Sequence, residues 1–132
     1  MREDFSVKII ESSIPETEMT AKDRIKLKDT SSAVSLDSAV SDDAPITIVP
    51  IAYAVLSVHN DKAKGDKDYT QILIMDADGA KYITGSNSFY NSFRDIWDEL
   101  DFNSTGEKFE LKIYRRPSKN YAGKSFITCA LV

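Results

Sequence analysis

Residues 81–100, KYITGSNSFYNSFRDIWDEL, decide the fold, because the spacing of apolar residues changes within them. Lys81–Thr84 continues the alternation of a β-strand. From Phe89 onward the apolar residues recur at intervals of three and four, which places them on one helix face. That face consists of Phe89, Phe93, Ile96, Trp97 and Leu100. Residues 86–88 (SNS) offer three oxygens that can cap the first turn. The stretch therefore predicts a strand followed by one amphipathic helix.

Two more strands are predicted upstream of this helix. Residues 46–59 form a long β-branched run, and Pro50 within it favours an edge position or a bulge. A polar loop follows at residues 60–68, and residues 69–75 then predict a second strand. The turn-forming residues 76–79 (DADG) send the chain back as the antiparallel strand that precedes the helix.

Two strands are predicted downstream. Asn103–Gly106 ends the helix, and Phe109, Leu111 and Ile113 then alternate with polar residues, as in a half-buried strand. After a turn at residues 117–123, the last strand places three apolar residues on one face, namely Ile127, Cys129 and Leu131. The chain from 46 to 132 thus has the element order β-β-β-α-β-β.

This order predicts a mainly β fold, a five-stranded oligonucleotide/oligosaccharide-binding (OB) barrel over residues 46–132. An α+β sheet covered on one side has the same element order, so the order alone leaves closure of the barrel open. Residues 29–45 contain no aromatic residue and no glycine, and predict a flexible acidic segment. We therefore expect residues 1–45 to form a mobile arm, in which Phe5–Ile10 could make a short strand. The arm would serve either to dock a protein partner or to solubilise the chain.

The charge is unevenly distributed in this 132-residue chain of formal net charge −4. Residues 104–132 carry six basic and two acidic side chains, net +4, whereas residues 1–46 and 47–103 each carry −4. In an OB barrel the ligand contacts strands 2 and 3 and the loops that join strands 1–2 and 4–5. Here these loops are residues 60–68 and 117–123, and both contain lysines. This coincidence favours nucleic-acid binding over a solvated hairpin with ordinary surface lysines.

Binding single strands without base specificity requires cations for phosphates and flat rings for bases. The segment from Lys112 to Phe126 interleaves both, and Tyr114 is expected on the outward side of its strand between Lys112 and Arg116. Ordinary cross-strand packing is the alternative role for each ring. The predicted nucleic-acid-binding residues are Lys62, Lys64, Lys67, Tyr82, Lys112, Tyr114, Arg115, Arg116, Lys119, Tyr121, Lys124 and Phe126.

The sequence gives little support for a zinc site, a disulfide, a membrane-spanning helix or a secretory signal. The single histidine, His59, excludes paired-histidine zinc motifs, and the single cysteine, Cys129, excludes an internal disulfide and multi-thiol metal sites. The longest apolar run, residues 46–58, is shorter than the roughly 18 residues of a membrane-spanning helix. Residues 1–5 are too acidic to open a secretory signal. We therefore expect a cytoplasmic protein without catalytic residues, metal, cofactor or membrane contact.

Four short motifs carry a resemblance: residues 81–86 (KYITGS), 92–96 (SFRDI), 117–120 (PSKN) and 123–126 (GKSF). On these the region 46–132 resembles small single-stranded DNA-binding proteins of bacteriophages and related mobile elements. The resemblance implies an OB-type fold, sequence-tolerant binding of single-stranded DNA and a role in replication or recombination, in the host cytoplasm if the chain is phage-encoded. Housekeeping bacterial relatives recruit partners through an acidic carboxyl-terminal tail, whereas the acidic segment of this chain is amino-terminal.

A competing hypothesis is a phage-borne protein-interaction module, an inhibitor or structural subunit, that binds no nucleic acid. The sequence leaves open whether the chain forms a homo-oligomer.

Overall fold

The computed structural model describes residues 5–41, 44–60, 68–117 and 125–132. Strands predominate, so the fold is mainly β as predicted, although these described residues contain four helices where one was expected. The elements in chain order are β1 Phe5–Ser12, α1 Ala21–Lys28, β2 Val34–Ser35, α2 Leu36–Ala39, β3 Ile46–Ile48, β4 Pro50–Asn60, β5 Asp68–Asp76, β6 Lys81–Thr84, α3 Asn87–Glu99, α4 Phe102–Thr105, β7 Leu111–Pro117 and β8 Ser125–Leu131.

The described strands form two sheets, one with the order β1-β4-β5-β6-β2 and one with the order β3-β7-β8. The single long strand predicted over residues 46–59 is two strands in the structure. β3 belongs to the three-stranded sheet, and β4 belongs to the five-stranded sheet. At the division, the Val49 amide donates a hydrogen bond to Asp76 Oδ2 at 3.0 Å, and the Ala77 amide donates to the Val49 carbonyl at 2.9 Å. The predicted irregularity at Pro50 is confirmed by a register shift between Pro50 and Ala52.

The main core is built around α3, whose predicted apolar face is confirmed at four of its five positions, among them Ile96, which is partly buried against the core. Phe89, Phe93 and Trp97 are buried, whereas Leu100 at the helix end is 36% exposed. Ser86 caps the helix by accepting a hydrogen bond from the Phe89 amide at 3.2 Å. Tyr53 of β4 meets two of these rings edge-on, with centroids 5.4 Å from Phe93 and 5.2 Å from Trp97. Apolar residues of β4, β5, β7 and β8 complete this cluster.

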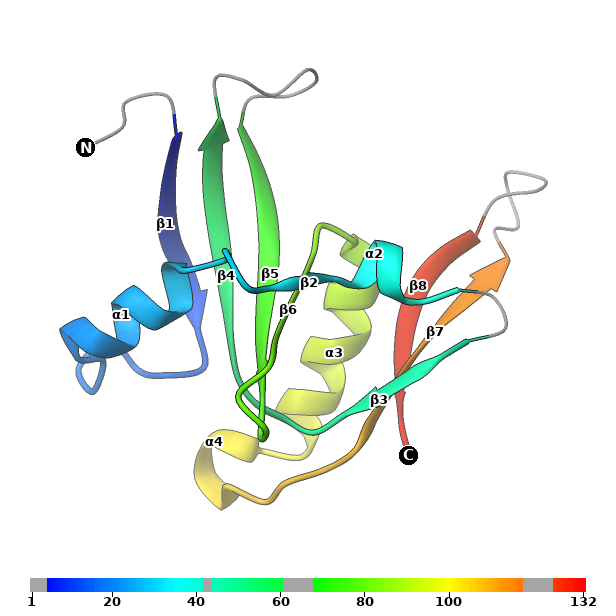
Figure 1. Ribbon diagram of the computed structural model, residues 1–132. Coiled ribbons are helices and arrows are strands. Elements are labelled where there is room, and N and C mark those ends of the chain that lie inside the picture. The colour runs from blue at the N-terminus through cyan, green and yellow to red at the C-terminus, as the bar shows by residue number, and fades with distance from the viewer. Residues whose placement is uncertain (1–4, 42–43, 61–67, 118–124) are drawn as a thin grey trace.

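The two sheets are open, and the described strands do not close the predicted OB barrel (Figure 1). The edge of β6 that closure would require is occupied by β2, which pairs with it in parallel through Val34 and Ser35. On β8, the Ile127 carbonyl accepts a hydrogen bond from the Ser88 hydroxyl of α3 at 3.2 Å. Since β6 and β8 already have these partners, they do not pair with each other.

The described part of residues 1–45 is packed into the fold, which differs from the mobile arm expected from composition. β1 pairs antiparallel with β4 over its length, from Phe5 opposite Asn60 to Ser12 opposite Ala54. Leu27 of α1 is 1% exposed in a second apolar cluster on the opposite side of the five-stranded sheet. Among the described residues of 29–45 only Leu36 and Val40 are buried, so an average over this segment does not reveal them.

A β-bulge in β1 connects this segment to α3. Ile9 lies opposite Leu56, and after the register shift Glu11 lies opposite Val55, which faces the main core. The extra residue turns the Glu11 side chain to the α3 side of the sheet. There Glu11 forms an ion pair with Arg94 and accepts a hydrogen bond from the Tyr90 hydroxyl at 2.5 Å.

Candidate nucleic-acid interface

The β7–β8 hairpin separates apolar from cationic side chains by strand alternation. Leu111 and Ile113 are fully buried on the core side. Lys112, Tyr114 and Arg116 lie on the other side, as predicted, and their cross-strand partners on β8 are Ala130, Thr128 and Phe126 respectively. On the other flank of β7, Thr47 of β3 lies opposite Lys112. We call this surface the β7 face: Thr47, Lys112, Tyr114, Arg116, Phe126 and Ala130. Thr128 is on the same side but is 7% exposed, and its Oγ1 atom lies 3.2 Å from Ser92 Oγ of α3.

The β7 face combines positive charge with aromatic rings. Lys112 and Arg116 are exposed, and Tyr114 and Phe126 are half-buried. The Lys112 Nζ atom lies 5.6 Å from the centroid of the Tyr114 ring. The face contains no acidic residue, and within the described part of the chain neither cation makes an ion pair. Both charges therefore remain available to an anionic ligand.

Arg115 was predicted to contact phosphate, but its side chain is engaged elsewhere. Its Nε atom donates to the Val40 carbonyl at 2.6 Å, and its guanidinium also donates to the Asp37 carbonyl and to Ser125 Oγ, the last at 3.3 Å. The first two bonds satisfy carbonyls at the end of the short helix α2. The structure therefore places Arg115 on the side opposite the β7 face, where it holds the amino-terminal segment.

The remaining predicted residues do not join the described interface. Tyr82 belongs to the five-stranded sheet, is half-buried and packs against the main core, and its burial raises the pKa of its hydroxyl. Its surroundings favour the packing role over a stacking role. Six further candidates lie outside the described residues, namely Lys62, Lys64, Lys67, Lys119, Tyr121 and Lys124.

Sequence reasoning missed a small recess between β5 and the start of α3. It has a volume of about 160 Å³. Val55 and Ile72 give it an apolar floor, and polar groups, among them those of Thr70, Ser86 and Asn87, contribute to its lining. No local pattern indicates this recess, because its walls come from β4, β5, β6 and α3.

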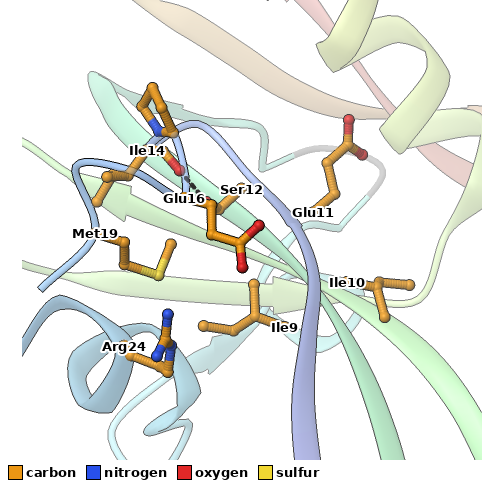
Figure 2. Close-up of a pocket in the computed structure, with 9 residues that line it drawn as sticks. Ile9, Ile10, Glu11, Ser12, Ile14, Glu16, Met19 and Arg24 are labelled. Atoms are coloured by element: carbon orange, nitrogen blue, oxygen red, sulfur yellow. Dashed lines mark hydrogen bonds between the residues drawn. The ribbon is translucent and has the colours of Figure 1, made fainter. Parts of the chain in front are cut away.

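A second cavity, of about 260 Å³, lies beside β1 (Figure 2). The sticks show Ile9 and Met19 lining it, with Arg24 of α1 below Met19 and beside Ile9, and Glu16 in front. Ser12 Oγ donates a hydrogen bond to the Ile14 carbonyl at 2.7 Å across its upper end. Two carboxylates, those of Glu11 and Glu16, accompany the single arginine in the lining, so this cavity does not favour a polyanion.

The surroundings of the Cys129 thiol and of the His59 imidazole are also defined by the structure. Cys129 is 6% exposed, which confirms the predicted buried thiol, and burial raises the pKa of this thiol to about 12. The His59 Nδ1 atom lies 2.7 Å from Asp68 Oδ1 on the neighbouring strand.

None of the helices in the described part of the chain has the length and apolar character needed to cross a membrane.

Comparisons of the chain with protein-family models, with curated proteins and with solved structures find no match.

Proposed function

We propose that this protein binds single-stranded DNA through the β7 face, with little sequence preference, in replication or recombination of the phage type. The observation that carries the proposal is the row Lys112, Tyr114, Arg116, a ring between two cations on one side of β7, with the carboxylate nearest in the chain, that of Glu110, just before the strand. The place in replication or recombination rests on the resemblance of residues 46–132 to phage-type proteins.

The spacing of this row suits a single strand. Alternate side chains of a strand are attached roughly 6.6 Å apart, so Lys112 and Arg116 leave the backbone at similar distances on either side of Tyr114. Lysine and arginine attract phosphates of any sequence, and the flat tyrosine ring offers a surface on which any base can stack. Bases of a duplex are already stacked on their neighbours, whereas those of a single strand are free to turn toward a side chain. The β7 face therefore supports sequence-tolerant binding of unpaired nucleotides.

The proposal is tested by fluorescence anisotropy with a labelled oligo-dT at low and moderate salt. The native chain should bind, and its affinity should fall as salt rises, because each neutralised phosphate releases counterions. A triple variant, Lys112→Ala, Tyr114→Ala and Arg116→Ala, should lose most of this affinity while keeping its circular dichroism. The matched control, Lys22→Ala with Lys26→Ala, removes two exposed lysines from α1 and should bind like the native chain.

Two results would refute the proposal. A folded native chain that does not bind the oligonucleotide even at low salt favours the protein-interaction hypothesis. Equal losses in the triple variant and in the α1 control would mean that charge alone, rather than the β7 face, attracts the strand.

A further inference from the structure

An apolar side chain stands exposed within the basic helix α1. Ile25 is 68% exposed, although Leu27, two residues further on, is buried against the sheet. Ile25 lies in a shallow groove of about 380 Å³, which Ala21, Arg24, Lys28 and Asp29 also line. The eight residues of α1 contain four basic side chains and one acidic side chain, net +3. We call this surface the α1 patch: Ala21, Arg24, Ile25 and Lys28.

A second exposed apolar surface has the opposite charge. Leu100 at the end of α3 is 36% exposed, and Leu131 at the end of β8 is 50% exposed. Both line a hollow of about 220 Å³ together with Glu107, Lys108 and Glu110. Residues 98–110 contain five acidic side chains and one basic side chain, all exposed, net −4. We call this surface the α3–β8 patch: Leu100, Glu107, Glu110 and Leu131.

The two patches cannot meet within one molecule. α1 packs against one side of the five-stranded sheet through Leu27, whereas α3 packs against the other side through Phe93 and Trp97. In Figure 1, α1 is well separated from the carboxyl end of β8. Any contact between the patches must therefore join two copies of the chain.

We propose that the protein associates head to tail, with the α1 patch of one copy seated on the α3–β8 patch of the next. Each patch has an apolar centre and a charged rim, the usual anatomy of a protein interface, and the rims carry opposite charges. The contact joins unlike surfaces, so repetition builds either a closed ring or an open row of copies. Such a row would suit a protein that coats a strand, but the association uses no residue of the β7 face and needs no DNA.

Sedimentation velocity in the absence of nucleic acid tests this association. The native chain at low salt should sediment faster as its concentration rises, and it should pass beyond the dimer. Two charge variants, Arg24→Glu with Lys28→Glu and Glu107→Lys with Glu110→Lys, should each be monomeric, because each lacks one patch. An equimolar mixture of the two should associate again and pass beyond the dimer, because the two native patches remain complementary and the two reversed patches also carry opposite charges.

A matched pair of isoleucine variants separates this interface from the exposed edge strand β1. Ile25→Ser should weaken self-association by roughly tenfold or more, the loss expected for one buried aliphatic side chain. Ile10→Ser, at an isoleucine of β1 that is 60% exposed, should leave the association unchanged. Circular dichroism melting checks that each variant is folded.

The proposal is overturned if the native chain stays monomeric at every concentration, or if the mixture of charge variants stays monomeric. Dimers formed by either charge variant alone would also overturn it, because they require a like-with-like interface. A loss of association in Ile10→Ser that equals the loss in Ile25→Ser would point instead to the edge of β1. None of these results bears on oligo-dT binding, so this proposal and the proposed function can fail separately.

Discussion

Adjacent arginines in β7 should have opposite roles, and replacing each in turn tests the placement of the interface. Arg115 donates three hydrogen bonds, to the carbonyls of Asp37 and Val40 and to the hydroxyl of Ser125. Each hydrogen bond contributes about 0.5–1.5 kcal/mol to the free energy of unfolding, and the half-exposed position of the side chain reduces this contribution. Arg115→Ala should therefore lower the free energy of unfolding by about 2 kcal/mol. Arg116 is exposed and makes no ion pair within the described part of the chain, so Arg116→Ala should change stability by less than about 0.5 kcal/mol.

Urea unfolding and oligo-dT titration measure the two effects separately. Arg115→Ala should lower the urea midpoint by roughly 1 M, given the usual dependence of unfolding free energy on urea, and should keep the native salt dependence of binding. Arg116→Ala should keep the midpoint and lower the slope of log K against log salt by about 0.7, the value of one phosphate contact on a single strand.

Replacing each arginine by lysine distinguishes a position that needs only a positive charge from one that needs the guanidinium group. Arg116→Lys should bind nearly as the native chain does, because a phosphate needs only a positive charge at this position. Arg115→Lys should remain destabilised, because a single ammonium cannot reproduce the planar fork that reaches both backbone carbonyls. If Arg115→Ala flattens the salt dependence while its stability stays native, then Arg115 contacts phosphate and its assignment to the amino-terminal segment is wrong.

Three further predictions concern the core, the stacking ring and the thiol. Leu36→Ala should lower the unfolding free energy by about 2–5 kcal/mol, because this side chain is fully buried in the main core, whereas Val34→Ala, at a residue 44% exposed, should cost far less in the same urea titration. Tyr114→Ala should weaken oligo-dT binding by about 1–3 kcal/mol at an unchanged melting temperature, and a lowered melting temperature with native affinity would show that the ring serves packing. Cys129 should react slowly with a thiol reagent in the folded protein at pH 8, because its raised pKa of about 12 leaves little thiolate, and unfolding in urea should restore ordinary reactivity.

The β7 face and the helix α3 could be predicted from sequence because each depends on short-range periodicity. A repeat of 3.6 residues fixed which side of α3 is buried, and Phe89, Phe93 and Trp97 lie there. Alternation over residues 111–116 likewise separated the buried Leu111 and Ile113 from the outward row that contains Tyr114. In both cases neighbours in the chain determine the side of the element, so the pattern is visible without knowledge of the partner.

The sequence by itself therefore determined the mainly β class, the amphipathic helix and the cationic outer side of β7. Only the tertiary structure decided that β2 occupies the edge of β6, that Leu36 fills the main core and that Arg115 holds carbonyls of Asp37 and Val40. The β2–β6 pairing and the Arg115 hydrogen bonds join residues more than forty positions apart, and all three contacts involve a few residues within a polar segment. Periodicity and average composition respond to neighbours in the chain, whereas an open sheet edge or an unsatisfied carbonyl is filled by whichever segment the fold brings beside it.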